Sequence, residues 1–178
     1  MHHVPRALGR SSRAAALIAV AALTLLVPAG LAQTPVSEAD TAEEAHPAHI
    51  HTGTCDTLGD VVAPLADVVD LAASGGEVVG PASALEVKTS QITVDMPLRE
   101  IIEGGHAINV HESAEAIDVY IACGDVGGVL VTDEGEREQL VIGLGELNDS
   151  GHTGTAWLGA AGDQTEVRVT LVEPDEMQ

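Results

Sequence analysis

Short runs of β-branched and aliphatic residues, separated by Gly, Asp and Pro, repeat from residue 46 almost to the end of the chain. This pattern is typical of β-strands joined by tight turns. We expect strands within residues 48–53, 60–71, 85–94, 106–111, 116–123, 138–147, 154–160 and 165–173. One helical turn is expected within 96–105, where Pro97 favours a start and two glycines an end. The sequence therefore predicts an all-β antiparallel sandwich or barrel with one short helix. Because there is no phenylalanine, we expect a core of Val, Ile, Leu and Ala with Trp157 as its one large ring.

The first 32 residues have the composition of a secretory signal peptide. Arg6, Arg10 and Arg13 precede an apolar run without any acidic residue. Small residues follow this run at Gly30 and Ala32. A basic start, an apolar middle and a small-residue cleavage site are the three parts of such a peptide. The alternative is a membrane anchor, but the run is shorter than the ~20 residues that a spanning helix needs. We expect cleavage after Ala32 and a protein that is secreted or held in the cell envelope.

Acidic residues dominate the rest of the chain. Residues 33–45 are acidic and lack large apolar side chains, which predicts a disordered linker. We expect one β-domain over residues 46–174 and a short tail at 175–178. All 28 acidic residues and only four basic ones lie in residues 33–178, so the formal charge of this part is −24. Such a charge excludes nucleic acids and anionic membranes as partners, because both require a positive surface.

Cys55 and Cys123 are the two cysteines of the chain. In an exported protein, two cysteines favour one disulfide, and two free thiols are the alternative. A bridge that closes so long a loop stabilises the fold by about 4 kcal/mol in the chain-entropy model. Each cysteine follows a group of histidines, so the bridge would also bring the two groups together.

The histidines are concentrated in "HPAHIHTGTC", which begins at His46, and in "HAINVH", which ends at His111. Side chains alternate between the two faces of a strand, so His49 and His51 share a face while Ile50 points into the core. His111 projects from the outer face if the aliphatic residues before it lie in the core. The three imidazoles would then form one nitrogen donor set, which suits copper or zinc rather than calcium or magnesium.

The other histidines are weaker candidates. His46 lies before the strand but would complete the set as a fourth ligand if the chain curls back. His106 is five residues from His111, so a regular strand turns it to the opposite face, although Gly105 can break that regularity. His152 lies in a glycine-containing turn and is expected at the surface. For each histidine, the alternative is a solvent-facing side chain at the end of a strand.

These segments resemble the copper/zinc superoxide dismutases. "HPAHIHTGTC" is similar to the His-x-His copper segment of that family and the loop after it. "INVHESAE" is similar to the strand with the late copper histidine, and "YIACGDV" to the segment with the second half of the family disulfide. The resemblance covers about residues 46–126, with only weak similarity between residues 68 and 105. It implies a Greek-key β-sandwich or barrel and a copper ion held by imidazoles. The ligands that it implies are His49, His51 and His111, whereas His46 and His106 remain candidates from strand geometry alone.

Two further resemblances bear on topology and function. "GTAWLGAAGDQTEVRVTLVE" is similar to the first hairpin of these dismutases, which there precedes the His-x-His strand. It implies a rearranged or circularly permuted fold in which the hairpin at 154–172 pairs beside the strand at 48–52. "HIHTG" also resembles chordin-type (CHRD) domains, a related sandwich without established catalysis.

Three departures from the dismutase pattern argue against fast dismutation. Residues 56–68, where the family has its bridging and zinc histidines, contain none, so we expect no dedicated zinc site. Tyr120 replaces the arginine that guides superoxide in the family. The charge of −24 repels an anionic substrate. The sequence favours an exported, copper-binding, dismutase-like domain with weak or no activity, and its catalytic residues stay unassigned. The alternative is a non-catalytic chordin-type structural or interaction domain.

Overall fold

The structure is a computed structural model that describes residues 45–72, 75–77, 79–81, 83–85 and 87–174. These residues belong to the second of two compact units, Val36–Gln178. The expected signal peptide, residues 33–44 of the expected linker and the tail at 175–178 lie outside the described residues. Within the described ranges, no helix has the length and apolar character needed to cross a membrane.

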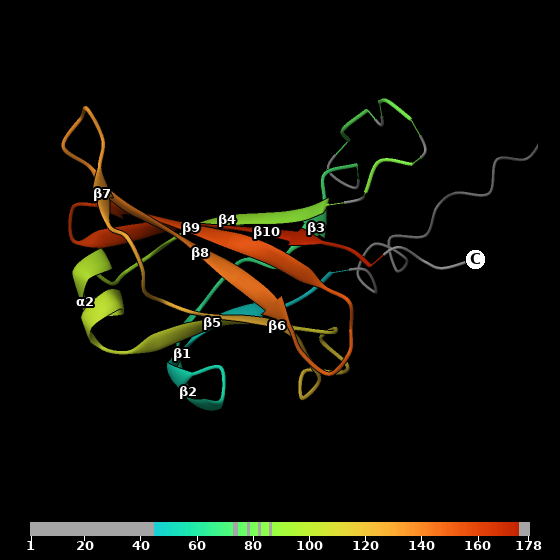
Figure 1. The fold of residues 1–178 in the computed structure, drawn as a ribbon, viewed down its shortest axis with the longest axis horizontal. Coiled ribbons are helices and arrows are strands. Elements are labelled where there is room, and N and C mark those ends of the chain that lie inside the picture. The colour runs from blue at the N-terminus through green and yellow to red at the C-terminus, as the bar shows by residue number, and fades with distance from the viewer. Residues whose placement is uncertain (1–44, 73–74, 78, 82, 86, 175–178) are drawn as a thin grey trace, which may run out of the picture. The chain divides into compact units, whose positions relative to one another are not determined.

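Antiparallel β-strands make up most of the described chain, with one short helix, so the all-β prediction is confirmed (Figure 1). The strands are β1 (Ala48–Thr54), β2 (Thr57–Pro64), β3 (Val69–Asp70), β4 (Val87–Val94), β5 (His106–His111), β6 (Tyr120–Asp125), β7 (Val131–Thr132), β8 (Glu138–Glu146), β9 (Thr153–Ala161) and β10 (Gln164–Val172). The helix is α2 (Leu98–Glu103). The strands follow the order β2-β1-β5-β6-β8-β9-β10-β4-β3, and β7 pairs with β8.

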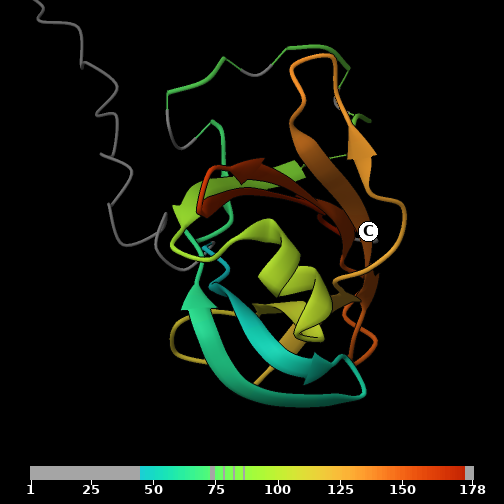
Figure 2. The ribbon, with the colours of Figure 1, turned by 90° about the vertical axis from the view of Figure 1, so that its left-hand side faces the viewer.

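This sheet curls around its own inner face, and α2 lies across one end of the curl (Figure 2). The helix buries Leu98 and Ile101 against the core. An antiparallel bridge between His46 and Val68, with N···O distances of 3.0 and 2.9 Å, joins the segment before β1 to the segment before β3. This bridge therefore connects the β1 side of the strand order to β3 at its other end.

The core is aliphatic, as the composition predicts. Alternate residues of the strands point inward, and the largest fully buried side chains are Ile50, Leu98, Ile101, Ile108, Ile121, Leu140, Leu158 and Leu171. Trp157 does not belong to this core, because its neighbours Ala156 and Leu158 are the residues that point inward. Its ring lies 4.6 Å from the guanidinium of Arg137 and 5.0 Å from that of Arg168 on the outer face. The expectation of a tryptophan in the core is wrong.

The C-terminal hairpin forms as β9 and β10, but not in the predicted place. It pairs with β8 on one side and with β4 on the other. In the strand order, β5, β6 and β8 separate it from β1. The predicted pairing beside residues 48–52 is wrong, because β2 and β5 already occupy both edges of β1.

The strand expected at 116–123 begins later, at Tyr120. A turn occupies the residues before it: Ala116 N–H donates to Ser113 Oγ at 3.1 Å, and Val119 N–H donates to the Ala116 carbonyl at 2.9 Å. The serine hydroxyl gives the backbone a turn in place of a strand ladder. This turn matters for the site, because it lies next to His111.

Candidate metal centre

Strands β1 and β5 lie side by side and turn three histidines to the outer face of the sheet. Their register pairs Ile50 with Ile108, and both are fully buried. The prediction that His49 and His51 share the face opposite Ile50 is therefore confirmed in its geometry. The backbone N–H of His111 donates to the Pro47 carbonyl at 2.8 Å, which extends the pairing toward the start of β1.

One potential ligand atom from each of His49, His51 and His111 lies within 4.8 Å of the others. His49 Nδ1 and His111 Nε2 are 2.8 Å apart. The imidazole rings of His51 and His111 are buried, and that of His49 is partly exposed. This group, called the histidine cluster below, can hold a metal ion.

Backbone carbonyls orient two of the three rings. Nδ1 of His51 donates to the Gly59 carbonyl at 3.0 Å, and Nδ1 of His111 donates to the Ile117 carbonyl. A carbonyl only accepts hydrogen bonds, so the proton of each neutral ring is on Nδ1 and the lone pair is on Nε2. His51 Nε2 is buried and has no hydrogen-bond partner among the described residues. This is the arrangement that orients histidine ligands in metal sites.

Irregular backbone places the carbonyls of Gly59 and Ile117 beside the two histidine rings. The pairing of β1 with β2 shifts register on both sides of His51, so β1 is bulged where the ring reaches across to Gly59. The Ile117 carbonyl comes from the turn that precedes β6. Sequence reasoning missed both carbonyls, and only the turn-forming Ser113 gave a signal near either of them.

Burial favours the neutral form of two of the histidines. It lowers the pKa of His49, and the neighbouring His51 lowers it further, against a smaller opposing effect of Asp67. Burial also lowers the pKa of His111, which outweighs the hydrogen bond to the Ile117 carbonyl. A neutral imidazole is the form that binds a metal, so these shifts favour ligation.

The disulfide between Cys55 and Cys123 is present, with their Cα atoms 5.8 Å apart. Cys123 is the β6 partner of Asn109 in β5, so the bridge spans β5 and connects the end of β1 to β6. The backbone N–H of Cys55 also donates to Asp125 Oδ1 at 2.7 Å. The prediction that the cysteines pair and link the two histidine segments is confirmed.

His46 does not curl back to the histidine cluster. Its Nδ1 donates to the Glu112 carbonyl at 2.7 Å, and its Nε2 is 3.0 Å from Lys88 Nζ. The bridge to Val68 fixes its backbone, and both ring nitrogens have partners. The structure thus corrects the expectation of a fourth ligand at this position.

His106 and His152 also lie elsewhere. His106 is on the inner face of β5, as regular alternation predicts, and its Nδ1 donates to the Ile101 carbonyl at 2.8 Å. His152 was expected at the surface, but it is 9% exposed. Its Nε2 is 3.3 Å from Glu173 Oε2, so an acidic partner beyond the end of β10 draws it inward.

His46, His152 and Glu173 form a second group with metal-like spacing. Here, however, the buried ammonium of Lys88 lies 3.0 Å from His46 Nε2 and 3.5 Å from Glu173 Oε2. A resident cation repels a second one, so we interpret this group as an internal ion network. Burial raises the pKa of Glu173, but the hydrogen bond with His46 and the charge of Lys88 outweigh it, and the net pKa is lowered.

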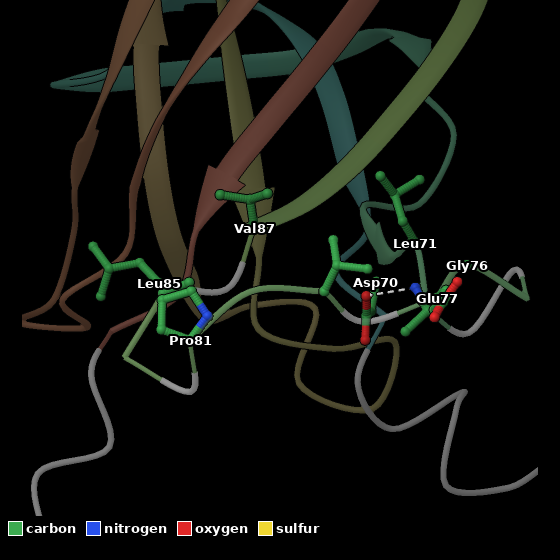
Figure 3. A pocket seen from close by; sticks show the side chains of 10 residues that line it. Asp70, Leu71, Gly76, Glu77, Pro81, Leu85 and Val87 are labelled. Atoms are coloured by element: carbon green, nitrogen blue, oxygen red, sulfur yellow. Dashed lines mark hydrogen bonds between the residues drawn. The ribbon is translucent and has the colours of Figure 1, made fainter.

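A hollow lies beside the start of β4 (Figure 3). Its lining is mainly aliphatic, with Leu71, Leu85 and Val87. Asp70 belongs to it, but its carboxylate accepts the backbone N–H of Ala72 at 2.7 Å. Among the described residues, no histidine belongs to this lining.

Comparison with protein-family models, with curated proteins and with solved structures found no match in any of the three.

Proposed function

We propose that the chain is an exported copper-binding β-domain of the superoxide dismutase-like type, with weak or no dismutase activity. One observation carries the proposal. The nitrogens of His49, His51 and His111 converge, two of the rings are oriented by carbonyls, and His51 Nε2 is buried without a partner. A buried polar atom without a partner costs about 1–3 kcal/mol, and a metal ion would remove that cost.

Copper fits this donor set better than other ions. Three imidazole nitrogens suit copper or zinc, whereas calcium and magnesium prefer oxygen ligands. Between the first two, copper(II) binds a given nitrogen site more tightly. The resemblance of residues 46–126 to the copper/zinc superoxide dismutases points to the same ion.

The surroundings of the cluster argue against fast turnover of superoxide. Tyr120, which replaces the guiding arginine of the family, packs its ring 5.1 Å from that of His111. Asp67 and Asp118 act electrostatically on His49 and His111, respectively. Negative charge near the site and over the whole chain lowers the local concentration of an anion.

Copper retention tests the proposal. The purified protein is loaded with Cu(II) and desalted in a His2→Ala/His3→Ala background, so that the N-terminal histidines cannot contribute. We expect about one retained copper per chain, and almost none after His49→Ala/His51→Ala, because that variant keeps only one of the three imidazole ligands. His152→Ala, which removes a histidine outside the cluster, is the matched control and should retain the metal.

Equal retention in the double variant, or no retention in the parent protein, would refute copper binding at this site. The non-catalytic chordin-type domain would then be the remaining interpretation. Superoxide turnover by the copper-loaded protein separates a copper holder from an enzyme, and we expect little above that of the double variant.

A further inference from the structure

Asn109 lies in the middle of the outer face that carries the histidine cluster. It is the direct cross-strand partner of His49 in the pairing of β1 with β5. It also precedes His111 by two residues on β5, so both side chains project from the same face. The side chain is fully buried, which is unusual for an asparagine and requires hydrogen-bond partners.

The amide of Asn109 is only half satisfied. Its Nδ2 is 3.4 Å from His111 Nε2, the atom that carries the lone pair of that ring. Its Oδ1 is buried and has no hydrogen-bond partner among the described residues. An amide can exchange its oxygen and nitrogen by a half rotation of the side-chain end. After such a rotation, the oxygen occupies the position beside His111.

We propose that Asn109 supplies its side-chain oxygen as a fourth ligand to the metal held by His49, His51 and His111. This inference rests on the proposed function. Two ligands about 2.0–2.1 Å from one ion lie about 3.3 Å apart at a tetrahedral angle and about 2.8 Å apart at a right angle. The 3.4 Å between Asn109 Nδ2 and His111 Nε2 is close to the first value. In the structure His49 Nδ1 donates a hydrogen bond to His111 Nε2, and its length of 2.8 Å is close to the second value.

A fourth protein ligand would determine whether the metal keeps an open position for water or substrate. Residues 56–68 offer no histidine to complete the coordination. A three-histidine site without another protein ligand keeps a water molecule or an open position for substrate. With the Asn109 oxygen in that position, the site holds its ion without a water ligand there, as a storage or structural site does.

Binding and hydration of Cu(II) test the inference in the full chain with the His2→Ala/His3→Ala background. Asn109→Val removes the amide at nearly constant volume, and we expect the dissociation constant for Cu(II) to rise about 10–100-fold. Water-proton relaxation by the bound Cu(II) should also increase, because water takes the vacated position. Asn109→Asp keeps an oxygen ligand and should keep both tight binding and low relaxation.

Thr165→Val is the matched control. Thr165 is equally buried and its Oγ1 donates to the Met96 carbonyl at 2.7 Å, on a strand that does not contribute to the cluster. This variant loses a buried hydrogen bond as Asn109→Val does, but it should leave the affinity for Cu(II) within about twofold. Thermal unfolding of each metal-free variant shows that it is folded.

The outcomes distinguish the two proposals. A parent protein that binds no Cu(II) would overturn the proposed function and this inference with it. A parent protein that binds Cu(II), together with an Asn109→Val protein of unchanged affinity and unchanged relaxation, would overturn the inference alone. If Asn109→Val does not fold, Asn109→Gln, whose amide is displaced by one methylene, takes its place with the same two readouts and the same expected direction.

Discussion

The internal ion network gives a prediction that does not depend on any metal. Glu173, 18% exposed in its side chain, lies within 3.5 Å of Lys88, His46 and His152. The change Glu173→Gln keeps the size of the side chain and its ability to hydrogen-bond, but removes the negative charge. The buried ammonium of Lys88 then faces two histidines without this counter-charge.

The loss of stability in Glu173→Gln depends on the contacts that Lys88 retains. Breaking a buried ion pair by removing one partner costs about 3–5 kcal/mol. Lys88 retains its contact with His46 Nε2, so we expect the lower end, about 3 kcal/mol at pH 7. For a domain of this size, that corresponds to a fall in melting temperature of about 10 °C. Adding Lys88→Met should recover part of the loss, because the double variant buries no uncompensated charge.

The stability that the Glu173 carboxylate contributes should decrease at acidic pH. The pKa of Glu173 is lowered in the folded protein from its ordinary value of 4.5, because the hydrogen bond with His46 and the charges around it outweigh burial. The stability that the carboxylate contributes is therefore fully present above about pH 4.5 and is lost as the pH falls through the folded-state pKa. The difference between the parent protein and Glu173→Gln should shrink in the same window.

Urea unfolding with the disulfide intact measures these quantities at pH 7.0, 5.5 and 3.5. The reasoning is refuted if Glu173→Gln loses less than about 0.5 kcal/mol at pH 7, which is the range of ordinary surface substitutions. It is also refuted if the loss is the same at pH 3.5 as at pH 7, since the contribution of the carboxylate declines once the pH falls below the unfolded-state pKa of 4.5.

Two further predictions concern the disulfide and the release of copper. Cys55→Ser/Cys123→Ser opens a loop with a sequence separation of 68 residues and should lower the free energy of unfolding by about 4 kcal/mol. Urea unfolding measures this loss, and an unchanged unfolding midpoint would contradict the prediction. Because burial lowers the pKa values of His49 and His111 below 6.5, protons should displace copper only as the pH falls below that value. Stepwise dialysis to lower pH measures the release of copper, and loss of the metal at pH 7 would contradict the prediction.

Alternation along a strand was enough to find the histidine cluster. His49 and His51 are two residues apart, and the buried aliphatic residues beside them determine which face they take. The same rule placed His111 outside the curl and His106 inside it. What alternation cannot give is the register between strands, which decides that Asn109, and no other residue of β5, is opposite His49.

The ion network could not be predicted for a different reason. His46, Lys88, His152 and Glu173 come from four separate segments. The pairing of β10 with β9 and β4 places His152 and Lys88 near Glu173, and the bridge to Val68 brings in His46. No local pattern encodes such a meeting, and His152 in its turn looked like a solvated residue. The pairing of β9 and β10 with β8 and β4 was missed for the same reason, since hairpin formation is local but the position of a hairpin in a sheet is not.

The burial of β5 explains why the outer face of β1 and β5 is suited to a ligand. All six residues of β5 are buried, although only alternate ones point into the core. The outward residues Asn109 and His111 are therefore shielded from water and need partners in the protein. Asn109 Oδ1 and His51 Nε2 nevertheless have none among the described residues, at a cost of about 1–3 kcal/mol each. A sheet with nothing to bind would be more stable with aliphatic side chains at these two positions, so their buried polar atoms argue for a ligand on this face.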